Sequence, residues 1–133
     1  MVRLILYTDR AARGNPGPAA MGIVLTDTKG KEIEAHGRTI GEATYNEAEY
    51  RALLWALERA RANRADELLI QTDSELLTRQ LDGTYRVRAA NLKPLYDQTC
   101  RSLAEFGNYA IHHIPREQNR RADALANQAL DLA

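Results

Sequence analysis

Four acidic residues stand at positions from which they could act together: Asp9, Glu49, Asp73 and Asp123. Asp9 follows the apolar run LIL, and Asp73 follows the run LLIQT, so each is predicted to end a β-strand. Considered singly, Asp9 is explained by the turn of the Gly/Pro-rich loop after it, and Asp73 by the cap of a helix that starts there. Asp123 is explained as a surface acid in the first turn of a helix.

Glu49 has the least ordinary position of the four. On a helix, the residues three and four positions further on are Ala52 and Leu53, so Glu49 is predicted to lie on the apolar face. A carboxylate on a buried face costs several kcal/mol unless it is paired with a cation or bound to a metal. A buried ion pair and metal ligation therefore both remain open. Its neighbour Glu47 aligns instead with Arg51, as a solvent-exposed pair.

Taken together, the four acids indicate a metal site. Asp9 and Asp73 are expected at the carboxyl edge of a sheet, where open α/β folds place their sites, and Glu49 and Asp123 lie on helices that can reach this edge. Four carboxylates at one point repel one another unless cations bind between them. Oxygen ligands without His or Cys suit Mg²⁺ or Mn²⁺, and two such ions about 3.5–4 Å apart promote in-line displacement at phosphorus.

The elements that must position these acids follow from the periodicity of the sequence. We expect strands at residues 2–8, 19–27, 31–40, 66–72 and 108–115, and helices at residues 42–65, 73–83, 90–107 and 117–133. The strand at residues 66–72 is followed directly by the helix at residues 73–83, with Asp73 or Ser74 as its N-cap. The order β-β-β-α-β-α-α-β-α predicts an α/β fold with a mixed five-stranded sheet and helices on both faces.

The bulk composition restricts the class of protein. With 133 residues, the chain is expected to form a single domain, residues 1–133. Eighteen basic and eighteen acidic residues cancel, so net charge gives no sign of a polyanionic partner. One cysteine, Cys100, excludes a disulfide within the chain and favours the reducing cytoplasm. We recognise no signal peptide or membrane-spanning run and expect a monomer without an obligate protein partner.

Four motifs in order carry a family resemblance that extends from about residue 4 to the C-terminus. They are TD-x-A-x-x-GNPGP, N-x-AEY-x-ALL-x-AL, TDS-x-LL-x-x-QL-x-G-x-Y-x-VRA-x-NL-x-PLY and IPREQN-x-x-AD-x-LA-x-x-AL. The chain thereby resembles the type 1 ribonuclease H family, and its compact prokaryotic branch in particular. The resemblance implies the ribonuclease H fold, cleavage of the RNA strand of RNA/DNA hybrids, and a catalytic and metal-binding quartet formed by Asp9, Glu49, Asp73 and Asp123.

The resemblance also implies a two-metal mechanism with Mg²⁺, or Mn²⁺ as a substitute, and two ions per site when substrate is bound. One ion, between Asp9 and Asp123, would activate a water toward the scissile phosphorus. The other, near Asp9, Glu49 and Asp73, would neutralise the leaving 3′ oxygen. The products would carry a 5′-phosphate and a 3′-hydroxyl.

Substrate contacts are expected from a different set of residues. Asn15 and Asn46 match family positions that resemble substrate-contacting asparagines, although Asn15 also suits a turn. Thr44 is a weaker candidate, and Arg13 is a candidate phosphate contact or a solvated surface residue.

Arg10 stands where the family usually has glycine, and three interpretations remain open. The backbone is ordinary and the side chain projects to solvent; the side chain binds a phosphate of the hybrid; or the guanidinium crowds the metal site and weakens cation binding. The first two are favoured because the rest of the loop is intact.

The segment before the last helix is a second departure. Many relatives carry a loop there with a mobile histidine, whereas this chain has only Pro115–Asn119, with Arg116 as a candidate auxiliary residue. His112 and His113 are predicted in the preceding strand, with one of them in the core. A basic, Trp-rich protrusion is also missing, so we expect moderate affinity with marked salt dependence.

Two other functions remain as alternatives. A catalytically weak hybrid-binding module would result if Arg10 disables the metal site. A transposase or integrase core would use the same carboxylates on duplex DNA, but the intact GNPG loop and the two asparagines favour recognition of 2′-hydroxyl groups.

Overall fold

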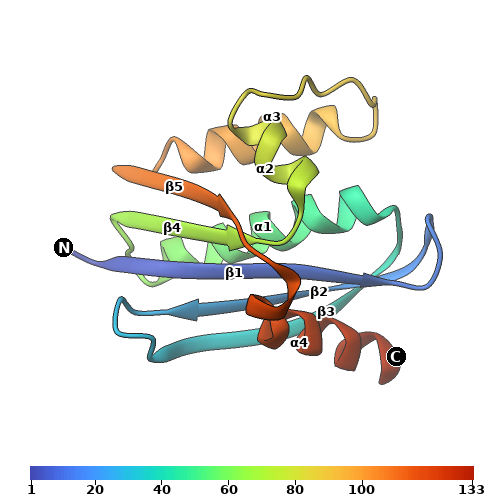
Figure 1. The fold of residues 1–133 in the computed structure, drawn as a ribbon, viewed down its shortest axis with the longest axis horizontal. Coiled ribbons are helices and arrows are strands. Elements are labelled where there is room, and N and C mark those ends of the chain that lie inside the picture. The colour runs from blue at the N-terminus through green and yellow to red at the C-terminus, as the bar shows by residue number, and fades with distance from the viewer.

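The computed structural model describes residues 1–133 as a five-stranded sheet with four α-helices and one short 3₁₀ turn (Figure 1). The strands are β1 (Arg3–Ala12), β2 (Gly17–Thr26), β3 (Glu32–Ala43), β4 (Glu67–Thr72) and β5 (Asn108–His113). The helices are α1 (Tyr45–Ala62), α2 (Glu75–Leu81), α3 (Lys93–Leu103) and α4 (Arg120–Asp131), and the 3₁₀ turn spans Arg116–Gln118. The predicted order of strands and helices is confirmed.

The sheet is mixed, as the sequence predicts. Its strand order is β3-β2-β1-β4-β5, with β1 at the centre. The first three strands form an antiparallel meander, whereas β4 pairs parallel to β1 and β5 pairs parallel to β4. The carboxyl ends of β1, β4 and β5 therefore meet at one edge of the sheet.

Helices cover both faces of the sheet. The main core lies between the sheet and α1, and includes the fully buried Leu6, Ile23 and Leu53. On the opposite face, α4 packs over β2 and β3 (Figure 1). The backbone of α4 comes so close that a Cβ at Gly22 would overlap the Ala122 carbonyl. This close approach requires glycine in β2 at the crossing point.

The predicted end of the first strand is wrong. β1 continues through Asp9 to Ala12, because these residues stay paired with β2, where Asp9 lies opposite Gly22. The parallel pairing with β4 ends one residue before Asp9, at Thr8 and Thr72. Asp9 is thus held by antiparallel pairing on one side while its other side faces the end of β4.

None of the helices is both long enough and apolar enough to cross a lipid bilayer.

Candidate active site

Three of the four acids converge at the carboxyl edge of β1 and β4. Asp9 and Asp73 directly follow the last paired residues of these two parallel strands, Thr8 and Thr72, so they lie side by side. Glu49 approaches from α1, and carboxylate oxygens of the three residues lie within 4.8 Å of one another. They line a cleft of about 480 Å³. The spacing is that of a cation site rather than of three independent surface acids.

Burial and neighbouring negative charge make Asp9 and Glu49 hard to ionise. Burial, together with the charge of Asp73, raises the pKa of Asp9 to about 7. Burial also raises the pKa of Glu49 well above its usual range, and the charge of Asp9 adds to this effect. The side chain of Glu49 is only 6% exposed, and its Oε1 has no hydrogen-bond partner. A cation at this point would offset both the repulsion and the lost solvation.

The start of α1 fixes the position of Glu49. Thr44 is the N-cap: its hydroxyl accepts from the Glu47 amide, and Glu47 Oε1 accepts in return from the Thr44 amide at 2.8 Å. The Asn15 side chain accepts from the Tyr45 amide at 2.9 Å, which fastens the Gly-rich loop to the same turn. Glu47 therefore closes a capping box, and the predicted pairing with Arg51 gives way to it. Thr44 has a clear structural role here.

Ser74 leaves Asp73 free to face the cleft. The Ser74 hydroxyl accepts from the Leu77 amide and caps α2, so the alternative in which Asp73 is the cap is wrong. The Asp73 carboxylate is half-buried beside Asp9 instead. Ser74 therefore caps α2, and its neighbour Asp73 contributes its carboxylate to the cluster.

Asp123 stands at the edge of this cluster. It lies in the first turn of α4, and its charge contributes to the raised pKa of Asp9. It is not one of the three acids whose oxygens lie within 4.8 Å, and its Oδ1 accepts from Asn127 Nδ2 at 3.1 Å. Of the predicted quartet, the structure brings three together and places the fourth nearby.

Asn119 is a positioning residue that the sequence did not single out. It is 1% exposed, and its Nδ2 donates to the Thr8 carbonyl, directly before Asp9, at 2.8 Å. This bond ties the N-terminus of α4, and with it Asp123, to the end of the β1–β4 pairing. The only available signal was its place in the motif IPREQN.

Replacing Asn119 with alanine should destabilise the protein by about 1–3 kcal/mol, because the Thr8 carbonyl loses its partner in a buried place. Thermal unfolding should show a Tm lower by about 5 °C. The control is Asn108→Ala at an exposed position of β5, which should leave the Tm unchanged within about 1 °C. Equal Tm values for the two variants would show that the bond does not anchor α4.

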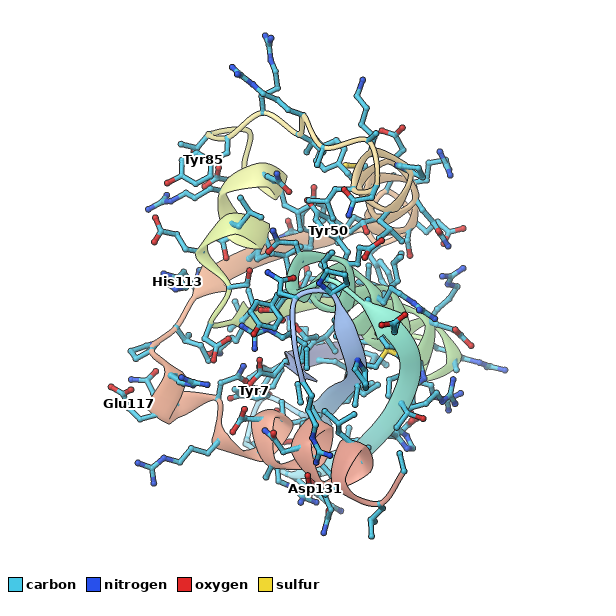
Figure 2. All side chains as sticks on the ribbon, turned by 90° about the vertical axis from the view of Figure 1, so that its right-hand side faces the viewer. Tyr7, Tyr50, Tyr85, His113, Glu117 and Asp131 are labelled. Carbon is cyan, nitrogen blue, oxygen red and sulfur yellow. The ribbon has the colours of Figure 1, made fainter.

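His113 and Arg116 also line the cleft. Both His112 and His113 are exposed, because α2 is the only helix with substantial contact to β5, so the prediction of a core histidine is wrong. His113 Nε2 lies 3.2 Å from the carbonyl oxygen of Asp73. Figure 2 shows His113 at the end of β5, between α2 and the turn that carries Glu117. A histidine therefore borders the cleft even though the loop that carries one in relatives is missing.

Arg10 does not project freely into solvent. Its φ is not positive, so the backbone is ordinary, as predicted. The side chain, however, stacks on the Tyr45 ring, with Cζ 4.3 Å from the centroid, and its Nε lies 4.0 Å from Glu49 Oε2. The guanidinium thus lies beside Glu49, at the edge of the carboxylate cluster.

The remaining substrate candidates differ in position. Asn46 is exposed and lines the cleft one turn before Glu49. Arg13 is not part of the cleft; it pairs with Asp131 in the last turn of α4. Arg13 therefore lies outside the cleft that contains Asp9, Glu49 and Asp73.

The donor set fits a divalent metal ion. Three carboxylates provide hard oxygen ligands, with no sulfur or imidazole within the cluster, and the unpartnered Glu49 Oε1 is a buried acceptor that a cation would satisfy. Arg10 does not satisfy the Glu49 carboxylate, since its Nε remains 4.0 Å from Oε2 and makes no hydrogen bond.

Comparison with known proteins identifies the family to which the chain is similar. The family described as Reverse transcriptase-like matches residues 8–129. Ribonuclease HI of Halobacterium salinarum is 44% identical over 98% of this chain and 66% of its own length. The crystal structure of RNase H1 from that archaeon superposes with a TM-score of 0.96, covering 98% of this chain and 99% of the crystallised one.

Two further relatives agree. The structure of LC11-RNase H1 in complex with RNA/DNA hybrid matches with a TM-score of 0.92 at 43% identity, over 97% of each chain. The Bifunctional protein Rv2228c of Mycobacterium tuberculosis is 35% identical over 99% of this chain but only 36% of its own length. The chain thus spans about two thirds or less of the first curated relatives that it matches. The matches, together with the sheet order and the carboxylate cluster, show that the chain belongs to the type 1 ribonuclease H family.

Proposed function

We propose that this protein hydrolyses the RNA strand of RNA/DNA hybrids in the presence of divalent cations, leaving 5′-phosphate and 3′-hydroxyl ends. The observation that carries the proposal is the cluster of Asp9, Glu49 and Asp73, whose oxygens lie within 4.8 Å at the edge of an open cleft. The 43% identity to LC11-RNase H1, which has been crystallised with a hybrid, supports the choice of substrate.

The protein's own groups have separate tasks in this reaction. Asp9 would hold cations from the centre of the cluster, and its Oδ1 is oriented by the Arg10 amide, which donates at 2.8 Å. Glu49 and Asp73 would hold them from α1 and from the end of β4, and Asp123 would complete the set from α4. Bound Mg²⁺ or Mn²⁺ would supply an activated water and charge neutralisation at the leaving oxygen.

Selection of the RNA strand would come from groups that contact the 2′-hydroxyl. Asn46 is the best placed, since it is exposed at the cleft beside the carboxylates. An amide side chain both donates and accepts, which matches the donor and acceptor character of the 2′-hydroxyl. Asn15 would act through the loop that it fastens to α1.

The test is cleavage of an RNA/DNA hybrid labelled on the RNA strand, in Mg²⁺ and in Mn²⁺, with EDTA as the control. Duplex DNA of the same sequence should remain intact, which separates this activity from that of a transposase or integrase core. Binding of the hybrid without cleavage in either metal would favour the catalytically weak binding module instead, and no binding would contradict both.

Arg116 is an exposed cationic side chain that lines the cleft, and we infer that it contacts a phosphate of the substrate. Arg116→Ala should raise KM by about tenfold, as expected for one lost charge-assisted hydrogen bond. The slope of log KM against log salt should fall by about one. Arg101→Ala, in a separate groove between α1 and α3, is the control and should leave both quantities unchanged. An unchanged salt slope in Arg116→Ala would remove this role.

A further inference from the structure

Arg10 and Arg38 form a matched pair on the sheet. Both lie opposite Met21, Arg10 on β1 and Arg38 on β3, so the three side chains share one row on the face covered by α1. Each guanidinium stacks on an aromatic ring of α1: Arg10 on Tyr45 at 4.3 Å and Arg38 on Trp55 at 4.4 Å. The two arginines differ in what lies beyond the ring, because only Arg10 has a carboxylate cluster beside it.

The contact between Arg10 and Glu49 is incomplete on both sides. The two side chains approach to 4.0 Å, at the outer limit of an ion pair and beyond a hydrogen bond. Arg10 Nε is buried without a hydrogen-bond partner, and so is Glu49 Oε1. Stacking on Tyr45 holds the guanidinium near the carboxylate but does not let it close on the oxygen. This geometry stabilises the cluster without saturating it.

A metal ion at Glu49 would therefore approach a fixed positive charge. The charge of Arg10 offsets part of the repulsion felt by Asp9 and Glu49, so part of the benefit that a cation would bring is already present. The incoming ion is also repelled directly by the guanidinium. Once the carboxylates are ionised, both effects lower the affinity of the free protein for divalent cations.

We propose that Arg10 is an internal counter-cation that competes with a divalent metal ion for the Glu49 side of the cluster, so that it sets the metal affinity of the free protein. The inference rests on the proposed function, because it assumes that the cluster binds metal. Arg10 acts on the carboxylates from its place above Tyr45 and is in this sense a positioning residue.

The test is Mn²⁺ binding by the whole chain without nucleic acid, measured from the EPR signal of free Mn²⁺. Arg10→Gln should bind Mn²⁺ about tenfold more tightly than the wild-type protein, a difference of about 1.4 kcal/mol. Arg10→Lys, which retains the charge, should stay within about threefold of the wild type. Arg38→Gln is the matched control, since it removes an arginine from the same row and the same kind of stack, and its Mn²⁺ affinity should equal that of the wild type.

Thermal unfolding provides a second readout that does not depend on catalysis. In EDTA, Arg10→Gln should unfold at a lower temperature than the wild type, because the buried carboxylates have lost their counter-charge. Saturating Mn²⁺ should raise its Tm by more than it raises that of the wild type. Arg38→Gln can lose stability through its stack, but Mn²⁺ should shift its Tm by the wild-type amount.

Equal or weaker Mn²⁺ affinity in Arg10→Gln, including no detectable binding to either protein, would overturn the proposal. This outcome leaves the proposed function to its own assay, since cleavage of the hybrid by the wild-type protein is measured separately. If the variant binds Mn²⁺ more tightly and no hybrid is cleaved, the role of Arg10 at the metal site stands and the proposed function falls.

Discussion

Replacing Asp73 with asparagine should lower the rate of RNA-strand cleavage by about a thousandfold or more, while the protein remains folded. Asp73 is one of three acids whose oxygens lie within 4.8 Å, so its replacement would remove one of the proposed cation ligands. Metal-assisted stabilisation of the transition state is worth several kcal/mol, and each 1.36 kcal/mol corresponds to a factor of ten in rate. The measurement is single-turnover cleavage of a labelled hybrid at saturating protein.

The variant should also unfold at a higher temperature than the wild type in EDTA. The charge of Asp73 contributes to the raised pKa of Asp9, so its removal relieves repulsion within the cluster. Ser74 caps α2, so the helix start is not affected. Asp97→Asn, at an exposed position of α3, is the matched control and should change neither the rate nor the Tm. An Asp73→Asn protein that cleaves within tenfold of the wild-type rate would contradict the metal-ligand role.

Without divalent ions, the protein should lose stability as the pH rises from about 4 to about 7. The pKa of Asp9 is raised from 3.8 to about 7 in the folded state, so between these values the folded protein binds more protons than the unfolded chain. Stability must then fall with rising pH, by up to about 4 kcal/mol from Asp9 alone, and the raised pKa of Glu49 adds to this loss. Thermal unfolding in EDTA at several pH values should show a fall in Tm of about 10 °C across this window.

Other groups of the protein allow this trend to be isolated. Glu34, whose pKa is lowered to about 2 by its hydrogen bond from Arg59, contributes stability that is lost only as the pH falls below about 4.5. Measurements between pH 5 and 8 therefore report mainly on the cluster. Saturating Mg²⁺ should remove or reverse the slope, because the ion binds the ionised carboxylates. A Tm in EDTA that rises from pH 5 to pH 7 would show that ionisation of Asp9 does not destabilise the folded protein.

The rate of cleavage should depend on the same titration of Asp9, but it should rise with pH where stability in EDTA falls. The carboxylates must be ionised to hold cations, so the hybrid-cleavage rate at low Mg²⁺ should increase with pH through the range in which Asp9 titrates, near 7. Stability in EDTA and activity in Mg²⁺ thus change in opposite directions with pH.

The sequence by itself determined the order of strands and helices and the helical face on which Glu49 lies. These features depend on local periodicity: the apolar spacing around Glu49 is a property of one helix, and the burial of Ala52 and Leu53 beside it confirms the prediction. The motifs also identified the family correctly. Both kinds of signal are carried within short stretches of chain, and they require no knowledge of what packs against them.

The tertiary structure decided where each side chain ends up relative to distant parts of the chain. β1 runs past Asp9 because β2 supplies pairing partners there, and His113 is exposed because little of the chain besides α2 packs over β5. The Arg10 guanidinium lies near Glu49 because α1 places the Tyr45 ring against the guanidinium. Pairing, edge position and contacts between elements are long-range properties, so the same local sequence is compatible with several outcomes until the sheet and helices assemble.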